Sequence, residues 1–342
     1  MKAAVLEGPG CLAVRELNEP VCPPGGALVE VEACAICPSD IKMARVGHRD
    51  LTYPRVLGHE VAGVVLEADP SLGVVPGARV QVWPGLACGA CPACRQGADN
   101  MCQSQGILGF NQDGGFAQRM AVPAECAQRG GMNLIPPGLS STVASLAEPL
   151  ACCVHAQRSA EVGPEDVVII FGAGPMGLLH TMLARSHGAV PLVVDPLKER
   201  RELALDMGAE VSVSPDDDSL LNDVRSLTPR GANVAILATP QASLDAVLDL
   251  MAPRGRVCLF SGLPRGGSSR EVDLNALHYR ELSLLGSYGC TSRSTTTALG
   301  LIAEGRVQAG RLITQEVSLT DLEKGFRHIE GREGLKSVVT EF

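Results

Sequence analysis

A glycine-rich segment between two apolar runs is the feature that most constrains the fold of this chain. The run VVIIF at 167–171 is rich in β-branched residues, as expected of a strand buried on both faces of a sheet. GAGPMG follows at 172–177, a helical pattern extends over 178–187, and VPLVV at 190–194 predicts a second strand. The G-x-G-x-x-G pattern alone is a weak signal, but between a strand and a helix it predicts a βαβ unit that binds a dinucleotide.

Each glycine of this segment has an expected role. Gly172 permits a tight turn, and Gly174 lets a pyrophosphate approach the backbone at the positive end of the following helix. Gly177 lets that helix pack closely on the strand. The expected cofactor-binding residues are Gly172, Gly174, Pro175, Met176, Gly177 and Asp195.

Asp195 follows the second predicted strand, 21 residues after Gly174. A carboxylate at this position accepts hydrogen bonds from the adenosine ribose hydroxyls and repels a 2′-phosphate, so the sequence favours NAD over NADP. Arg200 and Arg201 lie nearby and leave NADP open, although surface charge on the next helix explains them equally well.

The alternation of strands and helices continues along the middle of the chain. Strands are predicted at 234–239 and 256–262, with a helix between them, so this region is expected to form a doubly wound parallel sheet. The segment before it is rich in glycine and proline turns and predicts a mostly β domain. The 342 residues suit two domains. An exposed loop is predicted at 214–219.

Composition excludes several classes of protein. The formal net charge of −9 repels phosphate backbones, and only 3% of the residues are aromatic, so no nucleic-acid partner is expected. The longest apolar runs are too short to cross a bilayer, so no membrane partner is expected either. Thirteen cysteines without a secretory signal do not suggest a disulfide framework, and we therefore expect a reducing, cytoplasmic location.

Four of these cysteines fall within fifteen positions, in CGACPACRQGADNMC at 88–102. Each C-x-x-C step brings two thiolates to one ion, and the seven-residue gap before the last cysteine lets the chain return for the fourth corner of a tetrahedron. A redox C-x-x-C needs only two cysteines, and a zinc ribbon for nucleic acid conflicts with the acidic charge. The prediction is a closed structural Zn²⁺ site on Cys88, Cys91, Cys94 and Cys102.

A second group of ligand-type residues is spread along the chain. Cys37 follows the alternating run ALVEVEACAI, His59 and Glu60 precede VAGVV, and Glu148 precedes Pro149. Taken singly, each has an ordinary explanation: a buried core thiol, a hydrogen-bonded histidine or a helix cap.

Taken together, these motifs resemble a known family. The C-x-S-D turn, G-H-E, the four-cysteine segment and E-P-L occur in the order seen in zinc-dependent medium-chain dehydrogenases/reductases, most closely the sorbitol and threonine dehydrogenase branch. The resemblance covers essentially the whole chain. It implies that Cys37 and His59 bind a catalytic zinc, and that Glu60 and Glu148 ligate it directly or through water.

The resemblance also implies an architecture. It predicts a doubly wound Rossmann domain at 152–287 and a mostly β, GroES-like catalytic zinc-binding domain formed by 1–151 and 288–342. Two zinc ions per chain, one catalytic and one structural, are expected together with NAD, in a homotetramer or homodimer. Discontinuity of the catalytic domain follows from the resemblance and not from composition.

Two further residues receive catalytic roles alongside Cys37 and His59. Ser39 matches the family's residue that contacts the substrate hydroxyl and relays its proton. Asp40 is expected to hydrogen-bond His59, which would set the tautomer of the imidazole. The alternative for Asp40 is that it only caps a helix starting near Ile41.

The expected activity is hydride transfer between a secondary alcohol, namely a polyol, cyclitol or amino alcohol, and NAD. The alternatives are a zinc-free quinone or enone reductase and a family member that binds NAD with altered catalysis. Two departures from the family pattern weaken any choice of substrate. Pro38 stiffens the turn after Cys37, and Gly289 stands after Tyr288 where the polyol branch often has arginine.

Overall fold

The computed structural model describes residues 1–342 except 217–219 and 264–265, so the predicted loop at 214–219 lies partly outside the described residues. The chain divides into two compact units. The first contains Met1–Cys152 and Cys290–Phe342, and the second contains Cys153–Gly289. The N-terminal and C-terminal segments therefore belong to one unit, and the middle of the chain forms the other.

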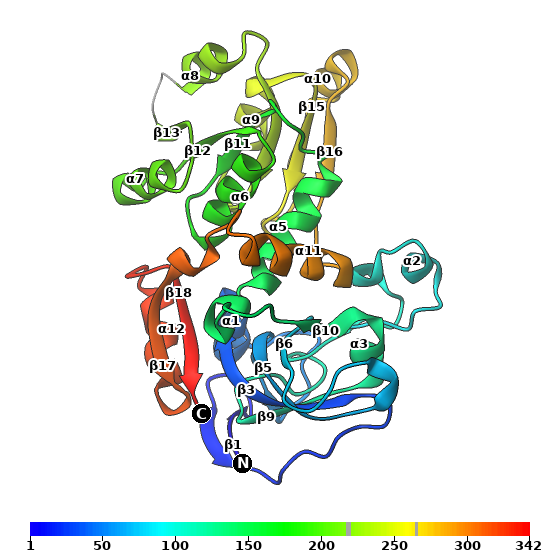
Figure 1. The fold of residues 1–342 in the computed structure, drawn as a ribbon. Coiled ribbons are helices and arrows are strands. Elements are labelled where there is room, and N and C mark those ends of the chain that lie inside the picture. Colours follow the sequence, from blue (N-terminus) through cyan, green and yellow to red (C-terminus); the bar gives the residue numbers. More distant parts are fainter. Residues whose placement is uncertain (217–219, 264–265) are drawn as a thin grey trace. The chain divides into compact units, whose positions relative to one another are not determined.

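The second unit is built on a six-stranded parallel sheet in the order β13-β12-β11-β14-β15-β16 (Figure 1). The central strand β11 (Val167–Phe171) is buried at all five positions, which explains its continuous apolar run. The other strands are β12 (Val190–Val194), β13 (Val211–Val213), β14 (Ala232–Leu237), β15 (Met251–Leu259) and β16 (Ser283–Gly286). The connecting helices are α6 (Pro175–Ser186), α7 (Lys198–Asp206), α8 (Leu220–Leu227), α9 (Leu244–Leu250) and α10 (Leu274–Arg280).

This topology confirms the predicted fold class. The two strands predicted at 167–171 and 190–194 have those bounds, and the helix between them begins three residues earlier than the apolar pattern indicated. The strands predicted at 234–239 and 256–262 begin two and five residues earlier than expected. The five-residue difference arises because β15 already pairs with β14 at Met251, opposite Ala232, ahead of the apolar run.

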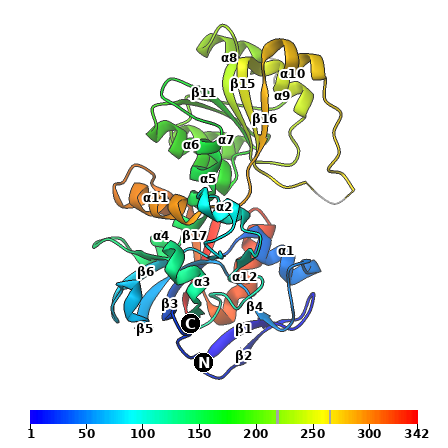
Figure 2. The ribbon, with the colours of Figure 1, turned by 90° about the vertical axis from the view of Figure 1, so that its right-hand side faces the viewer.

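The first unit is organised around a seven-stranded sheet in the order β10-β6-β5-β3-β18-β17, with β9 also paired to β3. A three-stranded sheet, β2-β1-β4 (Figure 2), and the two-stranded pair β7-β8 are the other sheets of this unit. The first strands in the chain are β1 (Lys2–Leu6), β2 (Leu12–Glu16), β3 (Ala27–Ala35), β4 (Arg55–Val56), β5 (Glu60–Ala68) and β6 (Arg79–Val82). The later strands are β7 (Gly85–Leu86), β8 (Gly106–Ile107), β9 (Arg119–Val122), β10 (Met132–Leu134), β17 (Ile313–Ser318) and β18 (Lys336–Glu341).

Short helices fill the connections of the first unit. The α-helices are α1 (Pro38–Val46), α2 (Pro92–Arg95), α3 (Ala124–Cys126), α4 (Ser141–Ala144), α11 (Ser292–Ala303) and α12 (Leu322–Glu330). The 3₁₀ and π segments are η1 (Pro70–Leu72), η2 (Asp99–Met101), η3 (Ala127–Gly131), η4 (Ala309–Leu312) and η5 (Leu319–Asp321). Helix α5 (Ala147–Ser159) begins in the first unit and continues into the second.

Two strand pairings bring distant parts of the first unit together. In the antiparallel pair β3–β5, Ala35 lies opposite Glu60, so the end of β3 meets the start of β5. Strand β18 pairs antiparallel with β3 on its other side, with Val338 opposite Ala35. The C-terminal strand therefore reaches the same end of β3, where the candidate site lies.

Candidate metal centres and dinucleotide loop

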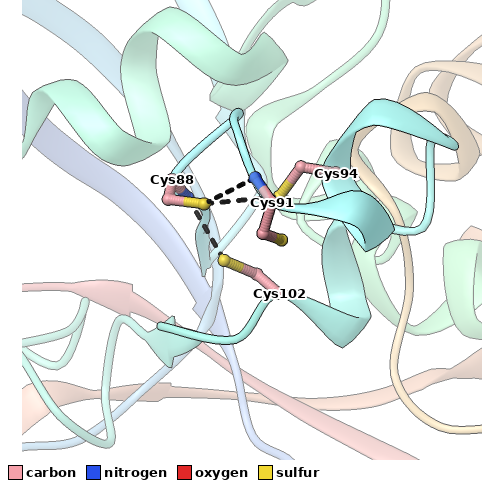
Figure 3. A group of neighbouring side chains, drawn as sticks. All are labelled: Cys88, Cys91, Cys94 and Cys102. Atoms are coloured by element: carbon pink, nitrogen blue, oxygen red, sulfur yellow. Dashed lines mark hydrogen bonds between the residues drawn. The ribbon is translucent and has the colours of Figure 1, made fainter.

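The four cysteines of segment 88–102 converge on one point. Their ligand atoms lie within 4.8 Å of one another, and Figure 3 shows the four side chains gathered around a common centre. Cys91 begins the short helix α2 as its N-cap, and Cys102 follows η2. Gly89 turns the chain between the first two cysteines with a φ of 71°, a conformation that glycine adopts without strain.

Backbone N–H groups stabilise the thiolate form of two of these cysteines. The Cys88 Sγ accepts a hydrogen bond from the Cys91 N at 3.3 Å (Figure 3) and another from the Ala90 N at 3.5 Å, and these bonds lower the pKa of Cys88. Backbone N–H groups of Cys94 and Gln103 lower the pKa of Cys91 to about 6.

The remaining thiols complete a donor set that fits zinc. Burial raises the pKa of Cys94 to about 12, so this thiol keeps its proton until a cation is present. Four sulfur donors at this separation, two of them already favoured as thiolates, suit a closed tetrahedral Zn²⁺ site. A site with four protein ligands has no open position for substrate, so its role is structural.

A second group consists of Cys37, His59 and Glu60, which each place one ligand atom within 4.8 Å of the others. Cys37 is the N-cap of α1, just after β3, and Glu60 is the first residue of β5. The β3–β5 pairing thus assembles the group. One thiol, one imidazole and one carboxylate are three protein ligands of the kind that catalytic zinc sites use, with a fourth position left for substrate.

Asp40 orients this group. It is fully buried; its Oδ2 accepts a hydrogen bond from the Cys37 N at 2.9 Å, and its Oδ1 lies 3.2 Å from the His59 Nδ1. Burial alone lowers the pKa of His59, but the Asp40 carboxylate raises it well above its ordinary value. Because Nδ1 faces Asp40, Nε2 is the nitrogen left for a metal ion. Asp40 therefore acts both as part of the helix cap and as the histidine partner.

Sequence reasoning missed Lys336, which contacts the same group. Its Nζ lies 2.7 Å and 2.5 Å from the two carboxylate oxygens of Glu60 and donates to the Ile36 carbonyl at 2.9 Å. Both side chains of the ion pair are almost fully buried. Burial lowers the pKa of Lys336, but Glu60 raises it above its ordinary value. No local sequence pattern indicates the role of Lys336, because 276 positions separate it from Glu60.

Glu148 belongs to a neighbouring set of ligand atoms. It lies with Cys152 and Cys290, whose ligand atoms are within 4.8 Å of its own. Burial raises the pKa of Glu148 to about 7, His59 lowers it, and Glu60 raises it further, so Glu148 is electrostatically coupled to the Cys37–His59–Glu60 group. Ser39 is partly exposed in the first turn of α1, two residues after Cys37.

The glycine-rich loop of the second unit has the geometry of a phosphate-binding turn. Gly172 has a φ of 100°, and a Cβ on Gly177 would lie 1.7 Å from the Gly172 carbonyl oxygen, so both positions require glycine. Gly174 is the N-cap of α6, which begins at Pro175 and continues through Met176. The N–H groups at the start of this helix are free of intrahelical partners and suit an anion.

Asp195 is fixed beside this loop. Its Oδ2 accepts from the Ala173 N at 2.7 Å and its Oδ1 accepts from the Leu197 N at 2.9 Å. Arg201 donates to the backbone carbonyls of Asp195 and Pro196 at 2.9 Å, so its guanidinium is bound to the same turn. The second unit thus combines a parallel α/β sheet with a dinucleotide-binding loop, and the chain also carries two zinc-type donor sets. Together these features define the class of this protein as a metal-dependent dinucleotide oxidoreductase.

Comparison with known proteins agrees with that class. The model of the alcohol dehydrogenase GroES-like domain matches residues 23–129, and the model of the zinc-binding dehydrogenase domain matches residues 175–304. The chain is 32% identical to L-threonine 3-dehydrogenase of Pyrococcus abyssi, over 88% of this chain and 86% of that protein. It is 29% identical to L-galactonate-5-dehydrogenase of Escherichia coli K12, over 99% of both chains.

A solved structure shows the same fold. A protein from Sinorhizobium meliloti 1021, described as a zinc-binding dehydrogenase and bound to NADP, superposes with a TM-score of 0.90 at 31% identity, over 99% of this chain and 98% of that one. The chain belongs to the zinc-dependent medium-chain alcohol dehydrogenase family. Within the described residues, no helix is both long and apolar enough to cross a membrane.

Proposed function

We propose that this protein catalyses reversible hydride transfer between a secondary alcohol and NAD, at a zinc ion held by Cys37, His59 and Glu60. The observation that carries the proposal is the convergence of these three ligand atoms within 4.8 Å, with His59 and Glu60 buried and Cys37 partly exposed, in a chain that also contains the dinucleotide loop. The first unit then serves as the catalytic domain and the second as the dinucleotide-binding domain.

A zinc ion at this group would supply Lewis acidity, which lowers the pKa of bound water from 15.7 to about 7, on the order of 12 kcal/mol. A positioned general base contributes about 3–5 kcal/mol, so the metal contribution is larger. The chain's residues prepare the site for this chemistry. Asp40 holds the His59 ring with Nδ1 occupied, and Lys336 balances the charge of Glu60.

Ser39 is the proposed proton carrier. It lies two residues after Cys37 in the first turn of α1 and is partly exposed, as a residue that passes protons to solvent must be. In this role it accepts the proton of the substrate hydroxyl and passes it outward. Glu148, whose pKa burial raises to about 7, is proposed to contact the catalytic ion through water.

NAD is the proposed cofactor. The Asp195 carboxylate is held in place by the N–H groups of Ala173 and Leu197, where it would meet a 2′-phosphate with like charge. Its remaining lone pairs suit ribose hydroxyls. The similar Sinorhizobium protein binds NADP, so cofactor choice needs a direct measurement of kcat/KM with each nucleotide.

Polyols, cyclitols and amino alcohols are the proposed substrate class. Support comes from the relatives that carry a sugar-acid and an amino-acid dehydrogenase name. The complete ligand sets argue against a zinc-free reductase and against a family member that has lost catalysis. The proposal also includes two zinc ions per chain, a homodimeric or homotetrameric assembly and a cytoplasmic location.

Replacement of Cys37 by Ser tests the proposal. Purified protein is incubated with NAD and a panel of secondary alcohols, polyols and amino alcohols, and NADH formation is followed. We expect the wild type to bind zinc at both the four-cysteine segment 88–102 and the Cys37–His59–Glu60 group. We expect the variant to lose the ion of the second group together with at least ~10³-fold in turnover, about 4 kcal/mol. Cys11→Ser, an exposed thiol, is the control. A zinc-depleted Cys37→Ser protein with near-normal turnover would rule out this mechanism.

A further inference from the structure

Two side chains in and beside the four-cysteine segment 88–102 hold the chain where α11 begins. The Trp83 Nε1 donates to the Cys290 carbonyl at 3.2 Å. The Asp99 Oδ2 accepts a hydrogen bond from the Ser292 Oγ at 2.6 Å, and both Asp99 carboxylate oxygens lie 3.3 Å from the Ser292 N. Because 193 positions separate Asp99 from Ser292, only the folded chain brings them together.

Asp99 has a defined place within the four-cysteine segment. It is the first residue of η2 and lies between Cys94 and Cys102, two of the four converging thiols. The Cys102 N donates to the Asp99 carbonyl at 3.1 Å, and the Asp99 side chain is partly buried. An ion bound by the four thiols would therefore immobilise the chain on both sides of Asp99.

The segment that Asp99 holds carries a thiol next to the proposed catalytic centre. Cys290 is buried, and its Sγ lies 3.7 Å from the Glu148 Oε1. Thr291, the fully buried N-cap of α11, follows it. Because the pKa of Glu148 responds to His59 and Glu60, Glu148 shares the electrostatic environment of the catalytic group. A shift of Cys290 would change the surroundings of this carboxylate.

We propose that Asp99 is a positioning residue for the catalytic centre: by holding Ser292, it keeps the Cys290 thiol beside Glu148. The four-cysteine segment then has a second role besides local stability, and the kinetic part of this role rests on the proposed function. Helix capping alone does not require Asp99, because the Thr291 Oγ1 already accepts a backbone N–H of α11. A carboxylate suits the positioning role, since hydrogen bonds to a charged acceptor are stronger than those between neutral groups.

Alkylation of Cys290 measures this role without any substrate. Full-length, zinc-loaded wild type and Asp99→Ala are treated with iodoacetamide, and modification of each cysteine is followed by mass spectrometry. We expect Cys290 to react at least ~10-fold faster in the variant, because losing hydrogen bonds to a charged group makes local opening about that much more frequent. Cys34, buried in the core of the same unit, should react as in wild type.

Turnover with NAD, and with the alcohol that the wild type oxidises, is the second measurement. We expect kcat/KM for the alcohol to fall about 10-fold in Asp99→Ala with an unchanged KM for NAD, because small displacements near the reacting atoms cost up to about 10²-fold. Asp99→Asn keeps an acceptor oxygen for Ser292 and should recover most of both losses. Arg95→Ala, which removes an exposed side chain of the same segment, is the matched control and should match wild type.

Unchanged alkylation of Cys290 in Asp99→Ala would overturn the proposal, as would equal acceleration at Cys290 and Cys34, which indicates general unfolding. Faster alkylation with unchanged kcat/KM would overturn the link to catalysis. Ser292→Ala removes the same hydroxyl contact from the α11 side and should also accelerate alkylation, so a folding defect in one variant leaves the other informative. If the wild type forms no NADH with any alcohol, the proposed function fails, and the alkylation result alone decides the role of Asp99.

Discussion

The four-cysteine lobe at 88–102 and the Cys37–His59–Glu60 group are two zinc-type sites assembled in opposite ways. In the lobe, every ligand comes from fifteen consecutive residues, and glycine turns and a one-turn helix bring the sulfurs together. In the second group, the ligands meet only because β3 pairs with β5. Local chain geometry therefore specifies the first site, whereas the second site depends on how the strands of the sheet pair.

The two sites also differ in how their charge is balanced. The lobe relies on backbone N–H groups, which lower the pKa of Cys88 and Cys91. The Cys37–His59–Glu60 group relies on neighbouring side chains: Asp40 pairs with His59, and Lys336 pairs with Glu60. Removal of Asp40 or Lys336 should therefore affect the Cys37–His59–Glu60 group without disturbing the lobe.

The largest expected effect is loss of the lobe metal in Cys91→Ser. Zinc binding contributes about 10–16 kcal/mol to the folding of small zinc domains, so we expect the free energy of unfolding to fall by at least ~5 kcal/mol in this larger unit. Zinc analysis should show one ion lost, with the ion at Cys37 and His59 retained. Urea unfolding of the loaded protein provides the measurement, and an unchanged midpoint would mean that the lobe is stable without metal.

A smaller loss is expected when the buried ion pair is broken in Lys336→Met. The variant leaves the Glu60 carboxylate buried without its cation, which costs about 3–5 kcal/mol. Urea unfolding of metal-free protein measures the loss, because a bound cation would itself compensate Glu60. Lys336→Arg keeps the charge and should lose much less. Equal stability of the methionine variant and wild type would show that the pair is not needed to hold Glu60.

Asp40→Asn should weaken metal binding at one site only. Loss of a carboxylate partner to a ligating histidine typically costs 10–100-fold in metal affinity, about 1.4–2.7 kcal/mol. Competition with a chelator should show this change for the Cys37–His59–Glu60 ion, while the lobe ion is released as in wild type. Equal weakening of both ions would point to general destabilisation and would contradict the assigned role of Asp40.

The smallest effect concerns a buried histidine of the second unit that belongs to neither metal group. Burial lowers the pKa of His180 to about 3, so the folded state binds fewer protons than the unfolded state below pH ~6.5. Stability contributed by neutral His180 is complete above pH ~6.5 and falls as the pH decreases toward 3, by about 1 kcal/mol between pH 7 and 5.5. Unfolding of metal-free protein at several pH values, compared with His180→Gln, should show the dependence in the wild type alone. Parallel curves for the two proteins would exclude this source.

Much of the second unit was predictable from the sequence. The runs at 167–171 and 190–194 are strands with those bounds, because a strand buried on both faces must be apolar throughout. Gly172 and Gly177 occupy positions that a side chain would strain or block. Strand starts were less predictable at β15, where pairing extends beyond the apolar run to Met251.

The candidate site was predictable in its ligand types but not in its partners. Cys37, His59 and Glu60 were recognised as one group through the family resemblance, and the structure brings their ligand atoms together. Glu148 was expected beside them, and its pKa responds to His59 and Glu60, while its Oε1 also lies near the Cys152 and Cys290 thiols. A helix face explains the pairing of Glu148 with Cys152, but nothing in the sequence indicated that Cys290 would join them.

The sequence by itself determined the features that short-range geometry controls: the βαβ unit with its glycine loop, and the four closely spaced thiols of the lobe. Only the tertiary structure decided that Lys336 pairs with Glu60 and that the C-terminal strand lies beside β3. The physical reason is that contacts between remote side chains depend on strand order and register. Strand order and register follow from the packing of the whole sheet, and no short sequence motif indicates them.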